Sequence, residues 1–137
     1  MSKGVPLISK YMTAMPHTID SKQSLAQASA LMKTHKIRHL PVQSGSKTVG
    51  LLSLQDLNLL ASFASVNPET TQVESAMSSH PYCVTPDAAI DEVASHMAEH
   101  RIGSALIVQD NGTLVGIFTD TDALRTLAEV FQNRLKK

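Results

Sequence analysis

The chain has 137 residues, with 12 basic and 12 acidic side chains that give a formal net charge of zero. This length is enough for one compact domain or two small repeats sharing a core, without room for a large catalytic domain. The balanced charge argues against binding to nucleic acid or acidic membranes, and 4% aromatic residues provide few platforms for base stacking. No apolar run could cross a bilayer or act as a signal peptide, so we expect a cytoplasmic protein.

The start of the chain predicts one clear helix. Residues 7–12 carry apolar side chains at roughly helical spacing and predict a short helix at most. Residues 18–19 predict a brief extended segment. Ser24 and Gln27 then match a capping box, and the apolar residues that follow fall on one helical face. The pattern predicts a helix that begins at Ser24 and ends near residue 35.

A hairpin and a second helix follow. Residues 37–42 are rich in β-forming side chains, and Pro41 among them favours an edge strand or a bulge at the strand's start. Residues 48–52 predict the return strand, and residues 54–64 a helix with apolar side chains on more than one face. Such a helix must be covered on two sides, so we expect a homodimer. The polar stretch 65–73, which contains Asn-Pro, predicts a linker.

The second half of the chain repeats the first. Apolar positions and turns recur at an offset of 65 residues, which becomes 66 after a tight turn at 110–112, and the last helix is predicted from about residue 121 to 134. We therefore predict a tandem repeat of the order β-α-β-β-α, with repeat 1 at residues 8–64 and repeat 2 at residues 74–134. Neither repeat is large enough to be comfortably stable alone, so we expect one mixed α/β (α+β) unit.

The most informative stretch has the pattern Gly-x-x-Ser/Thr-x-x-Asp, which occurs at residues 50–56 and again at 116–122. In each copy a predicted strand ends at the hydroxyl residue and a helix begins immediately after it. Two interpretations stay open. The hydroxyl and the acid cap the helix, with Asp in place of the usual Glu. Alternatively, the helix N-terminus binds an anion such as phosphate while the Asp holds sugar hydroxyls. The duplication, with its glycine, favours the second interpretation.

The doubled unit resembles a tandem pair of CBS domains over about residues 8–134, because Ile-Arg-His-Leu-Pro-Val leads the second strand and the Gly-to-Asp stretch closes the third. The resemblance implies a compact pair with a pseudo-twofold axis and a cleft between two sheets. It also implies a stand-alone regulatory module that binds an adenosine-type ligand there (AMP, ADP, ATP, S-adenosylmethionine or NAD) and acts on an unidentified partner protein. A structural dimerisation module with an empty cleft is the alternative.

The resemblance also assigns roles to individual residues. It gives the ribose hydroxyls to Asp56 and Asp122 and the phosphate to Ser53 and Thr119. A carboxylate suits a ribose because it accepts hydrogen bonds from both vicinal hydroxyls. The residues expected around the adenine are Thr18, Ile19, His39, Leu40, Pro41, Cys83, Val84, Ser104, Ala105 and Leu106.

The two sites are expected to be unequal. Arg38 and His39 lead the strand in repeat 1, whereas repeat 2 has Gly103 and Ser104 there. An Arg makes a charge-assisted contact with phosphate that no neutral residue reproduces. If Arg38 reaches a ligand held by repeat 2, Asp122 should contribute more to nucleotide binding than its counterpart in repeat 1.

Other chemistry has weaker support. Cys83 is the only cysteine, which excludes an internal disulfide and a zinc cluster of thiolates and suggests a small buried side chain. His96 and His100 have the spacing of two metal ligands on one helix face, but a third ligand is not evident, so a solvent or interface histidine is favoured. No nucleophile with a base is recognisable. We therefore expect neither an enzyme nor a metal site.

Overall fold

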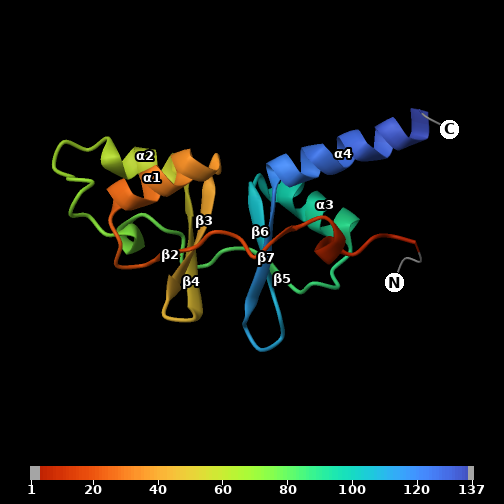
Figure 1. Cartoon of the computed structure of the whole chain (residues 1–137), viewed down its shortest axis with the longest axis horizontal. Helices are drawn as coiled ribbons and strands as arrows, with labels where there is room; N and C mark the ends of the chain where they lie inside the picture. Colours follow the sequence, from red (N-terminus) through yellow and green to blue (C-terminus); the bar gives the residue numbers. More distant parts are fainter. Residues whose placement is uncertain (1–3, 136–137) are drawn as a thin grey trace. The chain divides into compact units, whose positions relative to one another are not determined.

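The computed structural model describes residues 4–135, which form two compact units. Residues 16–81 make up the first, called here the repeat 1 unit, whereas residues 4–15 join residues 82–135 in the second, the repeat 2 unit. In each unit, helices cover one face of a β-sheet (Figure 1). The mixed α/β fold expected from the sequence is therefore confirmed. Among the described residues, no helix has the length and hydropathy needed to span a membrane.

The repeat 1 unit is a three-stranded sheet with two helices. Its elements are β2 (Ile19–Asp20), α1 (Leu25–His35), β3 (His39–Ser44), β4 (Lys47–Ser53), α2 (Leu54–Ala61) and the 3₁₀ helix η2 (Val73–Ser75). The strand order is β2-β3-β4, with β2 parallel to β3 and β4 antiparallel to it. Helices and sheet share one hydrophobic core, to which α1 contributes Leu25 and Met32. The capping box of Ser24 and Gln27 is present at the start of α1, as predicted.

The repeat 2 unit is a four-stranded sheet with two helices. Its elements are the 3₁₀ helix η1 (Ile8–Lys10), β1 (Thr13–Ala14), β5 (Cys83–Val84), α3 (Ile90–His100), β6 (Ser104–Val108), β7 (Leu114–Thr119) and α4 (Asp120–Leu135). The strand order is β1-β7-β6-β5. A separate core lies between sheet and helices and includes Ile8, Met97 and Phe118. The predicted turn at 110–112 closes the β6–β7 hairpin, with Gly112 at a φ of 89°.

The opening segment of each predicted repeat packs with the other half of the sequence. In the repeat 2 unit, β1 lies antiparallel to β7, with Thr13 opposite Ile117. The equivalent contact in the repeat 1 unit is an antiparallel bridge between Ser78 and Leu51 of β4. The predicted boundaries therefore describe the period of the sequence, whereas the compact units exchange these opening segments.

The repeated glycines lie where the exchanged segments cross the sheets. A Cβ on Gly50 would lie 2.6 Å from the carbonyl oxygen of Ser78 and 2.7 Å from Sδ of Met77. A Cβ on Gly116 would overlap the side chain of Met12. Close packing against backbone therefore leaves no room for a side chain at Gly50, whereas at Gly116 the obstacle is the flexible side chain of Met12.

The stretch expected to be a linker, residues 65–73, packs against the start of α1. The N–H of Leu25 donates to the oxygen of Thr71 at 2.9 Å, and that of Ala26 to the oxygen of Pro68 at 3.0 Å. Val73 is buried in the repeat 1 core. Because the first amides of a helix lack intrahelical partners, this stretch completes α1 and is an integral part of the unit.

Pro41 lies in β3, the central strand of its sheet, so of the two alternatives favoured from the sequence, an edge position or a bulge, the edge position is wrong. Opposite it, Leu51 exchanges its backbone hydrogen bonds with Ser78, at 2.8 and 2.9 Å. Pro41 therefore occupies a non-hydrogen-bonded pair with β4, and an N–H at this position would point towards β2. Pairing with β2 begins only at Val42, so the missing donor is not needed. A bulge follows between Val42 and Gln43.

Candidate functional site

The start of α2 joins a hydroxyl to an exposed carboxylate. Ser53 Oγ accepts a hydrogen bond from the N–H of Asp56 at 3.1 Å and so caps the helix. The N–H of Leu54 donates to the backbone oxygen of Arg38 at 2.8 Å. The side chain of Asp56 is exposed, and no residue within 4–135 donates a hydrogen bond to its carboxylate. This acid is therefore open to a ligand.

The start of α4 has the same backbone frame but a buried carboxylate. The N–H of Asp122 donates to Thr119 Oγ1 at 3.3 Å, and the N–H of Thr119 donates to Asp122 Oδ2 at 3.0 Å. This reciprocal pair is a capping box with Asp in the place of Glu or Gln. Asp122 is only 4% exposed, and its carboxylate also accepts hydrogen bonds from Thr13 and Arg125. The capping interpretation is confirmed for this copy.

The backbone amides at the start of α4 are also paired. The N–H of Asp120 donates to the oxygen of Gly103 at 3.0 Å, and the N–H of Thr121 donates to Asp120 Oδ1 at 2.8 Å. The next amide, that of Asp122, is capped by Thr119. A phosphate at this helix N-terminus would have to replace these partners.

Strand pairing brings the repeat 1 site residues onto neighbouring elements. His39 lies opposite Ser53 at the junction of β3 and β4, while Ile19 pairs with Val42 further along β3. The side chains of Ile19 and Leu40 belong to the hydrophobic core, so only their backbone is available to an adenine. The predicted site residues that lie in the repeat 1 unit are Thr18, Ile19, Arg38, His39, Leu40, Pro41, Ser53 and Asp56.

The repeat 2 site residues have an equivalent arrangement. Ser104 lies opposite Thr119, and Cys83 pairs with Leu106. Ala105 is in the core and Val84 packs against it, so their side chains are likewise withdrawn from a ligand. The predicted site residues that lie in the repeat 2 unit are Cys83, Val84, Ser104, Ala105, Leu106, Thr119 and Asp122.

Cys83 is exposed, so the expectation of a buried side chain is wrong. Successive side chains of a strand point to opposite faces, and Val84 is the neighbour that packs against the core. Partial burial nevertheless raises the pKa of the Cys83 thiol. The thiolate is the nucleophilic form, so this cysteine is poorly suited to covalent catalysis. Burial also raises the pKa of the neighbouring Tyr82 hydroxyl, and the Glu92 carboxylate raises it further.

Two aromatic stacks occupy equivalent places at the ends of α1 and α3. His17 stacks on His35 with ring centroids 3.6 Å apart. In the other unit, Tyr82 stacks on His96 and His96 on His100, each at 4.1 Å. His96, expected at the surface or an interface, is thus half-buried inside a stack. Residues 4–135 contain no group of three or more His, Cys, Asp or Glu side chains placed to hold a metal ion.

Two hydrogen-bond partners of Asp122 were not identified from the sequence. Arg125 lies three residues further along α4, and this spacing is itself a signal for a side-chain pair on a helix. Thr13 is 109 residues away in the sequence, and no local pattern links it to Asp122.

Comparison of the sequence with known protein families identifies the family of this chain. A profile of the CBS domain matches residues 8–60 and 72–129. The chain belongs to the CBS domain family. This CBS domain pair is 30% identical over 106 residues to the CBS domain-containing protein YhcV of Bacillus subtilis, a match that covers 77% of the chain and 74% of YhcV.

Two other curated relatives of this CBS domain pair are much longer enzymes. One is the inosine-5'-monophosphate dehydrogenase of Korarchaeum cryptofilum, 26% identical over 98% of the chain and 27% of that protein. The other is the L-aspartate semialdehyde sulfurtransferase of Methanocaldococcus jannaschii, 29% identical over 91% of the chain and 24% of that protein. The chain spans about a quarter of each.

Several solved structures have a similar fold. AcuB from Vibrio cholerae has a TM-score of 0.85 and 28% identity, covering 97% of this chain and 98% of that one. The CBS domain pair of MJ0100, in complex with 5'-methylthioadenosine and S-adenosyl-L-methionine, has a TM-score of 0.81 and 25% identity, covering 91% and 98%. CBSX2 in complex with AMP has a TM-score of 0.79 at 22% identity, covering 90% and 97%, and supports the fold alone.

Proposed function

We propose that this CBS domain pair is a regulatory module that binds an adenosine-type ligand and acts on a partner protein. The observation that carries the proposal is the exposed Asp56 carboxylate at the strand-to-helix junction, beside the Ser53 hydroxyl and without a donor among the described residues. The similar CBS domain pair of MJ0100, whose solved structure contains two adenosine derivatives, supports this class of ligand.

The chemistry of the repeat 1 residues favours a phosphorylated ligand. Asp56 accepts hydrogen bonds from the two ribose hydroxyls. Arg38 has an exposed side chain, and its backbone oxygen accepts from the first amide of α2, so its main chain lies next to a helix N-terminus. Both the cation and the helix dipole favour phosphate. We therefore rank AMP, ADP and ATP above S-adenosylmethionine, whose sulfonium is positive, with NAD as a further candidate.

Thermal unfolding with a panel of ligands tests the proposal. A ligand at a hundredfold excess over its dissociation constant stabilises the folded state by about 2.7 kcal/mol, which raises the melting temperature by several degrees. Asp56→Ala should reduce this rise, whereas Asp91→Ala, which removes an exposed acid in the first turn of α3, should preserve it. If AMP, ADP, ATP, S-adenosylmethionine and NAD all leave the wild-type curve unmoved at millimolar concentration, the module is not an adenosine sensor.

The capping box of α4 favours a second candidate function, a structural dimerisation module without a ligand. Thr119 and Asp122 satisfy each other there, so this copy of the stretch is explained by helix capping alone. The absence of any ligand-induced stabilisation, together with a dimeric mass in solution, would support this alternative.

A homodimer fits either function. Large apolar side chains are exposed on α4, and others lie at and just after α2. They are Leu59, Phe63, Leu124, Leu127, Val130, Phe131 and Leu135. Burial of such surface drives association. Light scattering of the wild type should therefore give twice the mass of one chain. The double variant Leu124→Glu/Leu127→Glu should give the mass of a single chain. A regulated partner and a cytoplasmic location stay predictions.

A further inference from the structure

The carboxylate of Asp122 is saturated by donors from its own chain. Thr13 Oγ1 lies 3.0 Å from Oδ1 and 3.2 Å from Oδ2, and Arg125 Nη1 lies 3.1 Å from Oδ1. Thr119 adds its N–H at 3.0 Å and its Oγ1 at 3.2 Å, both to Oδ2. An ionised carboxylate offers about four lone-pair sites, so no acceptor position is left over.

The repeat 1 unit lacks this arrangement, and one of the two extra donors has no counterpart there. The position equivalent to Arg125 is Leu59, which has no donor, and the position equivalent to Thr13 is Ser78. Ser78 keeps a hydroxyl and pairs with Leu51 as Thr13 pairs with Ile117, but its side chain makes no hydrogen bond to Asp56. No residue within 4–135 donates to the Asp56 carboxylate. The same acid in the same helix cap is therefore engaged in one repeat and open in the other.

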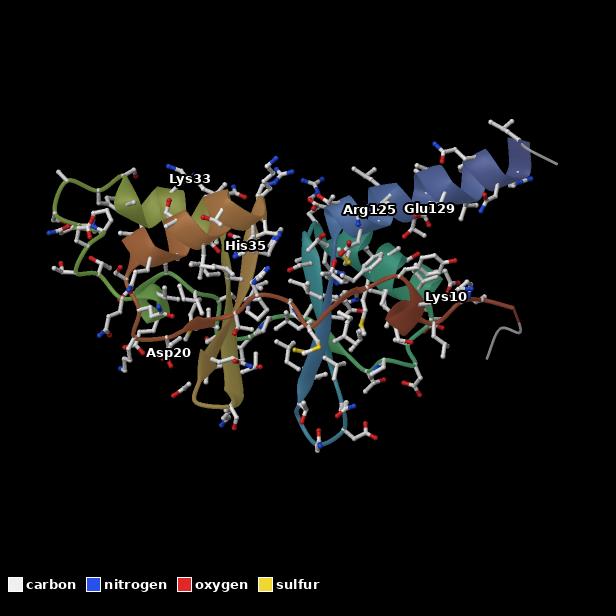
Figure 2. All side chains as sticks on the ribbon, in the orientation of Figure 1. Lys10, Asp20, Lys33, His35, Arg125 and Glu129 are labelled. Atoms are coloured by element: carbon white, nitrogen blue, oxygen red, sulfur yellow. The ribbon has the colours of Figure 1, made fainter. Side chains whose placement is uncertain are left out.

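The two extra donors at Asp122 are placed so that a ligand can displace them. The Arg125 side chain is 62% exposed and lies towards the N-terminal end of α4 (Figure 2). Thr13 is also exposed. Water can solvate both side chains after release, whereas the Thr119 amide belongs to the helix cap. A ribose diol would therefore compete with Thr13 and Arg125 while the cap stays intact.

We propose that Thr13 and Arg125 are internal competitors for the sugar-binding face of Asp122, so that the repeat 2 site binds adenosine more weakly than the repeat 1 site. The inference rests on the proposed function and reverses the order expected from the sequence, in which Asp122 contributes more. Arg125 lowers the affinity of the repeat 2 site, whereas Leu59, at the equivalent position, does not compete for Asp56 in the repeat 1 site. We expect the two dissociation constants to differ about tenfold, which corresponds to about 1.4 kcal/mol.

Titration calorimetry with adenosine tests this difference, because adenosine has no phosphate for Arg125 to bind. Asp56→Asn isolates the repeat 2 site, and adding Arg125→Leu to it should tighten adenosine binding about tenfold. Thr13→Val should act in the same direction. Arg134→Leu removes the same charge near the end of α4 and should not tighten binding. The mirrored change Leu59→Arg, made with Asp122→Asn, should weaken the repeat 1 site.

The outcomes separate this inference from the proposed function. If adenosine binds but Arg125→Leu and Thr13→Val leave the repeat 2 dissociation constant unchanged or raise it, the competition does not exist while the sensing function stands. If neither the wild type nor any variant binds adenosine or AMP, the function and the competition both fail. Circular dichroism of each variant shows that it is folded before it is titrated.

Discussion

The two copies of the repeated stretch have the same backbone frame and opposite carboxylate environments. Each has a hydroxyl cap, and the first amide of each helix donates to the residue just before a strand, Arg38 before β3 or Gly103 before β6. Asp56 is exposed, whereas Asp122 is 4% exposed and accepts hydrogen bonds from three side chains. A motif can therefore specify a helix cap without specifying whether its acid is available. Residues outside the motif decide that.

The largest expected effect concerns the cores behind the two stretches. Leu52 and Phe118 occupy equivalent positions and are buried in separate cores. Leu52→Ala should lower the free energy of unfolding by about 2–5 kcal/mol and Phe118→Ala by about 3–5 kcal/mol, measured by urea denaturation. The exposed Glu99→Ala should stay within about 0.5 kcal/mol of wild type. A loss below about 1 kcal/mol at either core position would show that its core is not packed as described.

The next largest effect is the difference in protein stability between variants that lack Asp122 and variants that lack Asp56. Asp122→Ala removes the acceptor of the Thr119 amide, Thr13 and Arg125, and should lower the free energy of unfolding by about 2–3 kcal/mol. Asp56→Ala changes an exposed side chain and should stay within about 0.5 kcal/mol of wild type. Equal losses in urea denaturation would remove the contrast between the two repeats.

The glycines sharpen the comparison further. Gly50→Ala should cost about 1–3 kcal/mol, because its Cβ meets the backbone oxygen of Ser78. Gly116→Ala should cost less, since the overlapping Met12 is a flexible side chain. In a double-mutant cycle, Met12→Ala should cost less in the Gly116→Ala background than in wild type. Additive losses would mean that Met12 is not the obstacle.

The smallest expected effect concerns the N-caps of the equivalent helices α1 and α3. Ser24 caps α1 with a full capping box, whereas Ala89 at the start of α3 makes no side-chain bond. Ala89→Ser should raise the free energy of unfolding by about 0.5–1 kcal/mol, since Glu92 occupies the position of the acidic partner in a capping box. Ser24→Ala should lower it by about 1 kcal/mol. Thermal unfolding measures both, and a loss of stability in the Ala89→Ser variant would contradict the cap geometry.

Local patterns predicted the secondary structure because caps, turns and apolar periods act over a few residues. The helix after Ser24, the hairpin around Gly112 and both strand-to-helix junctions are present where the sequence placed them. Long-range pairing was not visible in the same way. The period of the repeat does not indicate that residues 4–15 pack with the second half, nor that Thr13 binds Asp122 from 109 residues away.

The sequence predicted which positions form the candidate site, but it did not predict whether each side chain is exposed, buried or hydrogen-bonded. The exposure of Cys83 and the burial of Leu40 follow from the alternation of side chains along a strand. Which of the two sets is buried depends on the face of the sheet that the helices cover. Pro41 is tolerated in the central strand because its cross-strand partner Leu51 forms its backbone hydrogen bonds with Ser78. This contact joins segments that are distant in the sequence. The availability of the acids likewise depends on tertiary neighbours.

The most direct test of unequal sites is a titration of isotope-labelled wild-type protein with adenosine, followed by the amide chemical shifts of the two helix starts. The amides of residues 53–57 should shift first, and those of residues 119–123 only at about tenfold higher concentration. Shifts that begin at residues 119–123, or that appear at both helix starts at the same concentration, would contradict the account.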